Sequence, residues 1–298
     1  MKFSEQTKKY FKLILKLSIT SLALYFVFRK VDFEEIVKVF KTVQPWWLLL
    51  SFLSFNISKI IASFRIKHFY EASGVSLNSF YNIKLHYLGM FYNLFLPGSI
   101  GGDGYKVYLL KKDNENVKTK HLISGTFLDR LSGLTILFLF TCIFVYLSAF
   151  ADEIPYLDLI SVAGGILVIP GFFIFCRILF PVFNSKFLIT LHLSFWVQLL
   201  QVACALTLLY SLGIFENLMD YLTLFEVSSV VAVLPFTAGG VGARELVFLY
   251  GTQYLNIEEA SAVAFALLFF GITAATSFVG LFFSYDIDKI KKKETSSQ

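Results

Sequence analysis

Charged residues are scarce in this sequence, since Asp, Glu, Lys and Arg make up 16% of its 298 residues. Soluble domains carry roughly 25% charged residues, because their surfaces must meet water. Hydrophobic residues reach 56%, and Phe alone occurs 35 times. This composition excludes two soluble domains. It predicts an all-α, polytopic membrane protein, in which each apolar segment needs about 20 residues to cross the bilayer.

Cysteine and histidine are also few. The cysteines Cys142, Cys176 and Cys204 lie in apolar runs without C-x-x-C spacing, and the four histidines form no H-E-x-x-H pattern. The motifs G-x-x-x-x-G-K-[ST] and G-x-S-x-G are missing too. We therefore expect no metal, no cofactor and no enzyme activity. The net charge of +5 comes from basic residues between apolar runs, so nucleic acid is not an expected partner.

The sequence does contain long apolar runs, and six of them are long enough to span a membrane. Their flanks are basic, aromatic or turn-forming, as is typical of span ends. The six predicted spans cover residues 13–28, 46–64, 122–151, 156–176, 187–212 and 260–285.

Two further apolar stretches, 85–102 and 227–243, are interrupted near their ends by Pro and several Gly. Pro removes a backbone hydrogen bond and Gly weakens a helix, so a continuous helix would be costly there. Such breaks persist at membrane depth only where protein or a wet cavity covers the freed backbone groups. We interpret the two stretches as re-entrant hairpins over residues 84–110 and 221–255.

The distribution of Lys and Arg predicts the orientation. If the N-terminus is cytoplasmic, the inner segments hold 19 basic residues and the outer segments hold 5. Cytoplasmic loops carry such an excess, so we expect both termini inside a cell membrane.

The two broken stretches match each other. Residues 96–106 read L-P-G-S-I-G-G-D-G-Y-K and residues 234–244 read L-P-F-T-A-G-G-V-G-A-R. Two spans precede each copy and one follows it, so residues 1–150 and 151–298 form two repeats of inverted orientation. Paired, interrupted segments in inverted repeats indicate a transport site near the bilayer midplane. The alternative is that Gly and Pro serve independently as helix breakers.

The G-G-x-G stretches predict an anion site. Glycine lets the backbone approach a ligand, and the helix that follows exposes amide groups at its positive end. Lys106 and Arg244 fall in the first turns of those helices, where a shared phosphate or the membrane surface would explain them. Asp103 and Glu245 would bind a headgroup amine, pair with those bases or couple to protons.

Asp129 and Arg130 fall inside the third span, where an unpaired charge costs roughly 2.5–3.5 kcal/mol. Because they are adjacent, they project differently, and each needs its own partner or a wet cavity. Arg130 would hold a lipid phosphate or a structural carboxylate. Asn93 would bind the freed backbone or a ligand, and Lys59 is interpreted as reaching for the membrane surface. The candidate ligand-binding residues are Asn93, Pro97, Gly101, Gly102, Asp103, Lys106, Asp129, Arg130, Pro235, Gly239, Gly240, Gly242, Arg244 and Glu245.

Three motifs carry a resemblance to a known family. They are N-L-F-L-P-G-S-I-G-G-D at 93–103, D-R-L-S-G-L at 129–134 and L-P-F-T-A-G-G-V-G-A-R-E at 234–245. In this order they resemble the lysylphosphatidylglycerol synthase transmembrane region, a flippase-like membrane family. A module of this kind in the bacterial multiple peptide resistance factor is credited with flipping aminoacylated phospholipid. Lys106 stands where the family commonly has Arg, and Ala238 where it often has Pro.

The resemblance implies a lipid-handling membrane protein. The synthase domain of such relatives is not among these residues, so synthase activity is not expected. Our leading hypothesis is a flippase-like transporter of an anionic lipid, either a phospholipid or a polyprenyl-phosphate lipid, with Lys106, Arg130 and Arg244 as counter-charges. One alternative is an intramembrane headgroup or glycosyl transferase that uses Asp103, Asp129 or Glu245 as a base. Another is a non-transporting partner of a lipid-modifying enzyme. The sequence is also compatible with a homo-oligomer as the assembled state.

Overall fold

The computed structural model describes residues 33–95, 101–233, 243–255 and 257–295. The predicted first span, 13–28, lies outside these ranges. So do five candidate site residues, Pro97, Pro235, Gly239, Gly240 and Gly242.

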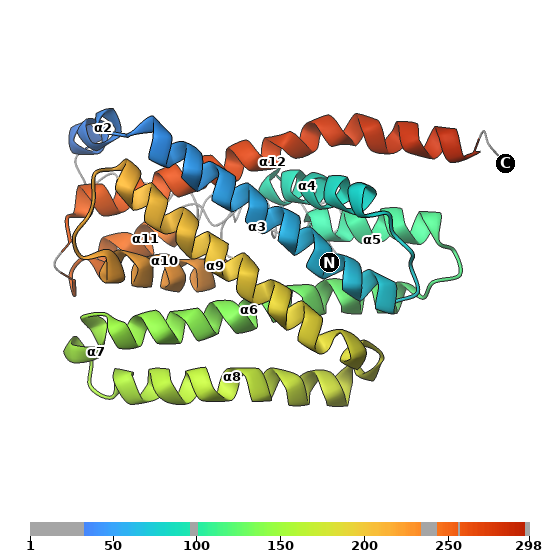
Figure 1. The fold of residues 1–298 in the computed structure, drawn as a ribbon, viewed down its shortest axis with the longest axis horizontal. Coiled ribbons are helices and arrows are strands. Elements are labelled where there is room, and N and C mark those ends of the chain that lie inside the picture. The colour runs from blue at the N-terminus through green and yellow to red at the C-terminus, as the bar shows by residue number, and fades with distance from the viewer. Residues whose placement is uncertain (1–32, 96–100, 234–242, 256, 296–298) are drawn as a thin grey trace, which may run out of the picture.

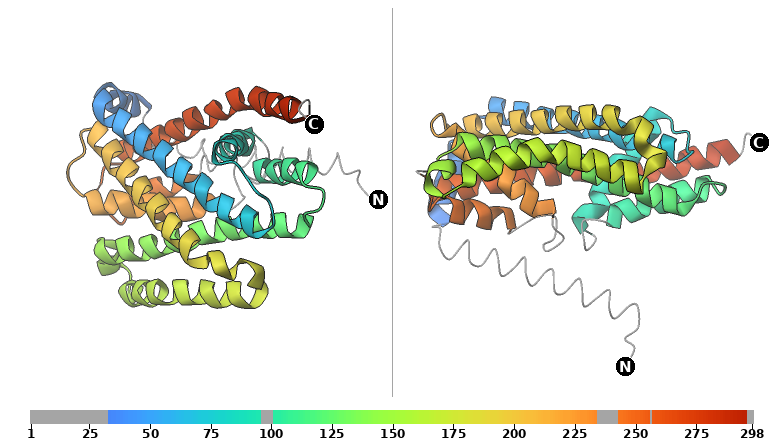
Figure 2. Two further views of the ribbon diagram at one scale, coloured as in Figure 1. Left: turned by 45° about the vertical axis from the view of Figure 1, so that its right-hand side comes forward. Right: turned by 90° about the horizontal axis from the view of Figure 1, so that it is seen from below.

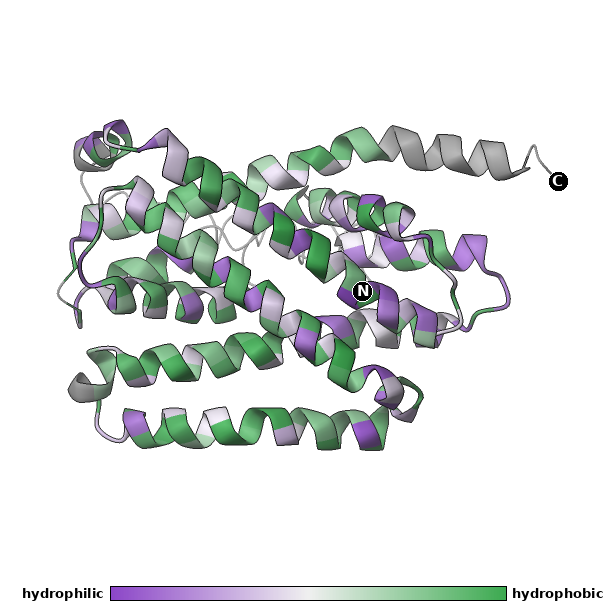
Figure 3. Ribbon diagram, viewed as in Figure 1, coloured by the Kyte–Doolittle hydropathy of each residue, from purple (hydrophilic) through white to green (hydrophobic). Residues whose placement is uncertain are grey.

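Within the described residues, five long helices are apolar enough to cross a membrane, which confirms the all-α polytopic class, and each of them overlaps one of the six predicted spans. Figure 1 shows them running roughly along the longest axis, and Figure 3 shows hydrophobic residues over most of their length. The five helices are α3 (Pro45–Ala72), α6 (Thr119–Leu147), α8 (Leu157–Leu179), α9 (Phe187–Ser211, preceded by the 3-10 helix η1, Pro181–Lys186) and α12 (Glu259–Thr295).

Helix α3 continues beyond the predicted end at residue 64. Its last turns contain Lys67 and Glu71, whose charged groups lie 3.7 Å apart. The same turns bury Phe69 and Tyr70. Polar residues therefore prolong this helix because their apolar neighbours pack and their charges pair along one face.

Two pairs of shorter helices occupy the predicted hairpins. Helices α4 (Ser79–Phe95) and α5 (Gly101–Asp113) pack against each other, as do α10 (Leu218–Val233) and α11 (Ala243–Gly251). The first pair lies at the end of the molecule where α3 ends, and the second pair lies at the opposite end (Figures 1 and 2). The other helices in the described ranges are α2 (Phe33–Lys41) and α7 (Phe150–Glu153).

The core lies where α3, α9, α10 and α12 meet. Helices α3 and α9 pack along much of their length, with the hydroxyl of Ser51 donating to the carbonyl oxygen of Cys204 at 2.8 Å. Phe225 and Phe269 meet edge to face, with ring centroids 4.9 Å apart. Helix α8 packs chiefly against α6 and leaves most of its apolar side chains exposed, which suits a lipid-facing helix.

The close backbone approach at Gly102 is made to another helix. A Cβ atom at Gly102 would overlap the carbonyl oxygen of Gly89 on α4, whereas one at Gly104 would meet nothing within 4 Å. Helix α4 is confined on another side as well, because a Cβ atom at Gly280 of α12 would overlap the carbonyl oxygen of Tyr87. Glycine at 102 is therefore required by helix packing.

We expect Gly102→Ala to lower the free energy of unfolding by about 1–3 kcal/mol, because α4 and α5 must separate to admit the methyl group. Gly104→Ala is the matched control in the same turn. It should be neutral or stabilising by up to about 1 kcal/mol, since alanine favours helix. Unfolding of both variants in detergent micelles tests this, and equal stability would contradict the packing argument.

Candidate functional site

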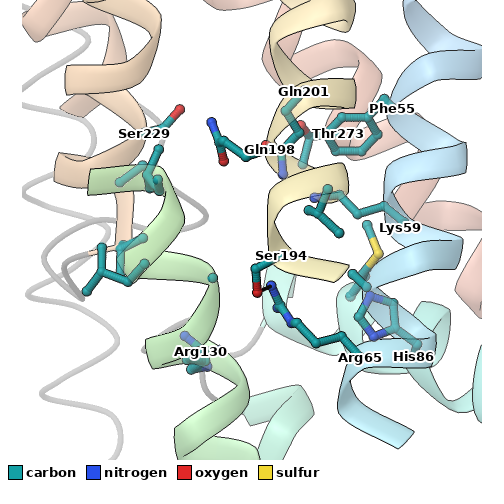
Figure 4. Close-up of a pocket in the computed structure, with 18 of the residues that line it drawn as sticks. Phe55, Lys59, Arg65, His86, Arg130, Ser194, Gln198, Gln201, Ser229 and Thr273 are labelled. Carbon is teal, nitrogen blue, oxygen red and sulfur yellow. Dashed lines mark hydrogen bonds between the residues drawn. The ribbon is translucent and has the colours of Figure 1, made fainter. Parts of the chain in front are cut away.

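A cavity of about 360 Å³ lies between the two helix pairs and the long helices. Helices α3, α4, α6, α9, α10, α11 and α12 all contribute to its wall (Figure 4). Its polar lining includes Ser194, Gln198, Gln201, Ser229 and Thr273. Gln198 and Thr273 lie near the middle of α9 and of the apolar part of α12, so the cavity sits at mid-depth of the bundle.

The cavity wall is cationic. Lys59, Arg65, Arg130 and Arg244 line it, and none of the described lining residues is Asp or Glu. Lys59 lies near the middle of α3, with its ammonium group 4.4 Å from the ring centre of Phe55. Our expectation that Lys59 reaches for the membrane surface is therefore wrong, because α3 is longer than its apolar run.

Arg65 was missed as a site residue because the predicted span ends one residue before it. In the structure its Nε donates to Asp129 Oδ1 at 2.8 Å and its Nη2 donates to Asp129 Oδ2 at 3.3 Å. Its Nη1 donates to the hydroxyl of Ser194 at 3.0 Å. A Cβ atom at Gly133 would lie 2.9 Å from that Nη1, so the glycine makes room for the guanidinium group. The unmatched charge of Asp129 was the sequence signal that could have pointed to Arg65.

Arg130 has a carboxylate partner of its own, which is one of the two alternatives that its position beside Asp129 left open. Its Nε donates to Asp103 Oδ2 at 2.5 Å, while Lys106 Nζ lies 2.7 Å from Asp103 Oδ1. Asp103 and Lys106 are 6% and 4% exposed, and the stem of Lys106 packs beside Gly89. Among the three roles considered for Asp103, the structure displays ion pairing. Lys106 does not line the cavity.

Arg244 enters the cavity from the first turn of α11. Its Nη1 donates to the hydroxyls of Ser228 and Ser229 at 3.0 and 3.2 Å. Its guanidinium carbon lies 4.5 Å from the ring centre of Phe269 and 5.5 Å from that of Phe225. These contacts hold the side chain without neutralising it. The motif-equivalent bases Lys106 and Arg244 thus have unlike surroundings.

The remaining described candidates do not line the cavity. Asn93 Oδ1 accepts a hydrogen bond from the Gly102 backbone amide at 2.8 Å, which satisfies a free donor in the first turn of α5. Gly101 begins that helix. Glu245 is fully buried on α11 and is not among the lining residues.

The chain is similar to known proteins over most of its length. The family described as the lysylphosphatidylglycerol synthase TM region matches residues 13–280. A phosphatidylglycerol lysyltransferase of Staphylococcus aureus (strain COL) is 23% identical over 260 residues, which are 84% of this chain and 30% of that protein. The UPF0104 membrane protein MJ1078 of Methanocaldococcus jannaschii is 27% identical over 215 residues, 60% of this chain and 86% of that protein. The chain therefore spans about 30% of the length of the lysyltransferase relative.

Proposed function

This chain belongs to the lysylphosphatidylglycerol synthase transmembrane family, and from that premise we propose that it moves an anionic lipid between the leaflets of the cell membrane. The lipid is a phospholipid or a polyprenyl-phosphate lipid. The observation that carries the proposal is the cavity at mid-depth, lined by four cations and by no carboxylate among the described residues.

A cation at membrane depth costs several kcal/mol unless something compensates it. Asp129 and Asp103 compensate Arg65 and Arg130. The contacts of Lys59 and Arg244 in the described chain are aromatic faces and serine hydroxyls. The carboxylates of Glu226 and Glu245 act on Arg244 from outside the cavity lining, so a phosphate group entering the cavity would be the anion in reach of both Lys59 and Arg244. The lipid tails would remain among the apolar helices.

The helix pairs support an inverted repeat as the frame of this site. His86 and Met90 of α4 line the cavity from one side, and Val233 of α10 and Arg244 of α11 line it from the other. We propose that α4–α5 is a re-entrant hairpin entering from the cytoplasm and that α10–α11 enters from outside. Two inverted hairpins meeting at a midplane site suit alternating access.

Cysteines introduced at Glu115 and Gln253 test this topology, since both side chains are exposed. Glu115 follows α5 and Gln253 follows α11, and Figure 1 shows these two helices at opposite ends of the molecule. We expect an impermeant maleimide to label Gln253→Cys on intact cells and Glu115→Cys only after permeabilisation. The parent chain, whose three cysteines are buried, is the control. Labelling of both positions from one side would contradict the inverted arrangement.

Transport is tested with the purified protein in liposomes that contain a trace of fluorescent phosphatidylglycerol. The name of the Staphylococcus aureus relative makes this lipid the first to try. We expect dithionite to bleach nearly all of the fluorescence in liposomes with protein and about half in liposomes without it. A fluorescent lipid with a zwitterionic headgroup serves as the matched control and should move more slowly. A polyprenyl phosphate is tested in the same way.

Bleaching that stops near half for every anionic lipid would contradict transport by this chain alone. The relative's name then favours a non-transporting role beside a lipid-modifying enzyme. Formation of a new lipid product in the same liposomes would instead indicate a transferase.

A further inference from the structure

A fully buried carboxylate lies directly behind the cavity wall. Glu226 on α10 is 0% exposed. Both of its oxygens accept hydrogen bonds from Nε2 of Gln198, at 2.8 and 2.7 Å. Gln198 itself lines the cavity and is labelled in Figure 4. Glu226 is therefore one side chain away from whatever occupies the cavity.

The hydrogen-bond partner of Glu226 is neutral, so its charge state depends on charges farther away. Helix α10 packs against α6, α9 and α11, and its Phe225 also meets Phe265 and Phe269 of α12, which carries no Asp, Glu, Lys, Arg or His between residues 260 and 283. Asp129 and Arg130, in the middle of α6, are engaged by Arg65 and Asp103.

Helix α9 carries no Asp, Glu, Lys or Arg, its His192 is exposed, and its Cys204 thiol contacts the Ser51 hydroxyl. On α10 itself, Asp220 accepts a hydrogen bond from the Ala149 amide at the far end of the helix.

Helix α11 contributes Arg244 and the fully buried Glu245, whose charge also acts on Arg244. Arg244 binds Ser228 and Ser229, which follow Glu226 on α10, and its charge acts on Glu226. Across the cavity, the charge of Arg244 also acts on Lys59. Arg244 is thus the cation that links the carboxylate of Glu226 to the cavity.

A carboxylate buried beside a neutral amide is costly in its ionised form, and a nearby cation reduces that cost. An anion bound to Arg244 offsets the positive potential that stabilises the ionised Glu226. We propose that Glu226 is a proton-binding site, and that it takes up a proton when an anionic headgroup enters the cavity and returns the proton when the headgroup leaves. The inference rests on the proposed function and adds an energy source to it, because a proton gradient would then drive the lipid.

The sign of the coupling follows from linkage. The proton comes from water and forms an O–H bond on the carboxylate, so the buried site loses one negative charge as the phosphate brings one. Over the pH range in which Glu226 is ionised in the empty protein and protonated in the lipid complex, one proton accompanies each lipid and the Kd rises about tenfold for each pH unit. Headgroup binding is therefore tightest at acid pH.

The experiment is calorimetric titration of the full chain in detergent micelles with short-chain phosphatidylglycerol, and separately with a short-chain polyprenyl phosphate. Each titration is run in two buffers of different ionisation enthalpy, so that the difference in heat counts protons. We expect uptake of up to about one proton per lipid bound, and the pH-dependent Kd given above.

Glu226→Gln keeps an amide in contact with Gln198 and mimics the neutral acid. It should bind lipid with no proton uptake at any pH. Asp220→Asn removes the other acid of α10 and is the matched control, which should take up protons like the parent chain. Uptake that survives in Glu226→Gln, or that disappears in Asp220→Asn, would overturn the assignment to Glu226.

The parent chain alone decides the matter if Glu226→Gln does not fold. Lipid binding without proton uptake would overturn the coupling and leave the transport proposal standing. Failure to bind either lipid at any pH would overturn both.

Discussion

Replacing Arg244 with Gln is expected to slow transport of an anionic lipid by roughly 10- to 150-fold. Hydrogen bonds to a charged group contribute about 1.5–3 kcal/mol, and Gln keeps a polar side chain but loses the charge. The fold should tolerate the change, because Arg244 contacts hydroxyls and aromatic faces and Gln leaves no contacting carboxylate unpaired. Initial bleaching rates in liposomes measure the effect.

Two further variants sharpen that test. Arg244→Lys keeps the positive charge but not the planar guanidinium group. We therefore expect its transport rate to lie between the rates of the parent chain and of Arg244→Gln. Arg177 is exposed on α8, away from the cavity, and Arg177→Gln is the matched control with an unchanged rate. Transport by Arg244→Gln at the parent rate would remove Arg244 from the site.

Asp103→Asn is expected to lower the free energy of unfolding by about 3–5 kcal/mol. The substitution conserves shape but leaves Lys106 buried without its carboxylate, and removing one partner of a buried ion pair has a cost of that size. Arg130 loses the same carboxylate, and its side chain is 34% exposed, so water can compensate part of its charge. Unfolding in mixed detergent micelles measures the loss.

Removing the cation as well should restore stability. The double variant Asp103→Asn with Lys106→Met replaces the buried ammonium group by an apolar side chain of similar length, so we expect most of the lost free energy to return. Arg130→Gln should destabilise far less than Asp103→Asn, because Lys106 continues to hold the carboxylate. Equal losses in Arg130→Gln and Asp103→Asn would show that Lys106 does not stabilise the carboxylate.

Several features of this protein follow from its sequence by local arguments. Five described spans coincide with apolar runs, because a backbone in lipid must form helix wherever side chains are apolar for about 20 residues. The same reasoning placed Asp129 and Arg130 inside a span and required for each its own partner or a wet cavity, and in the structure each has its own partner. The family resemblance is likewise confirmed by the match over residues 13–280.

The partners themselves were decided only by the tertiary structure. Arg65 lies 64 residues from Asp129, and Gln198 lies 28 residues from Glu226. Membrane helices are apolar toward lipid and toward protein alike, so no sequence period shows which face of α3 meets α6 or which face of α9 meets α10. For that reason Lys59, Arg65 and Glu226 were not among the predicted site residues, and only the crossing of the helices brings these three residues together around one cavity.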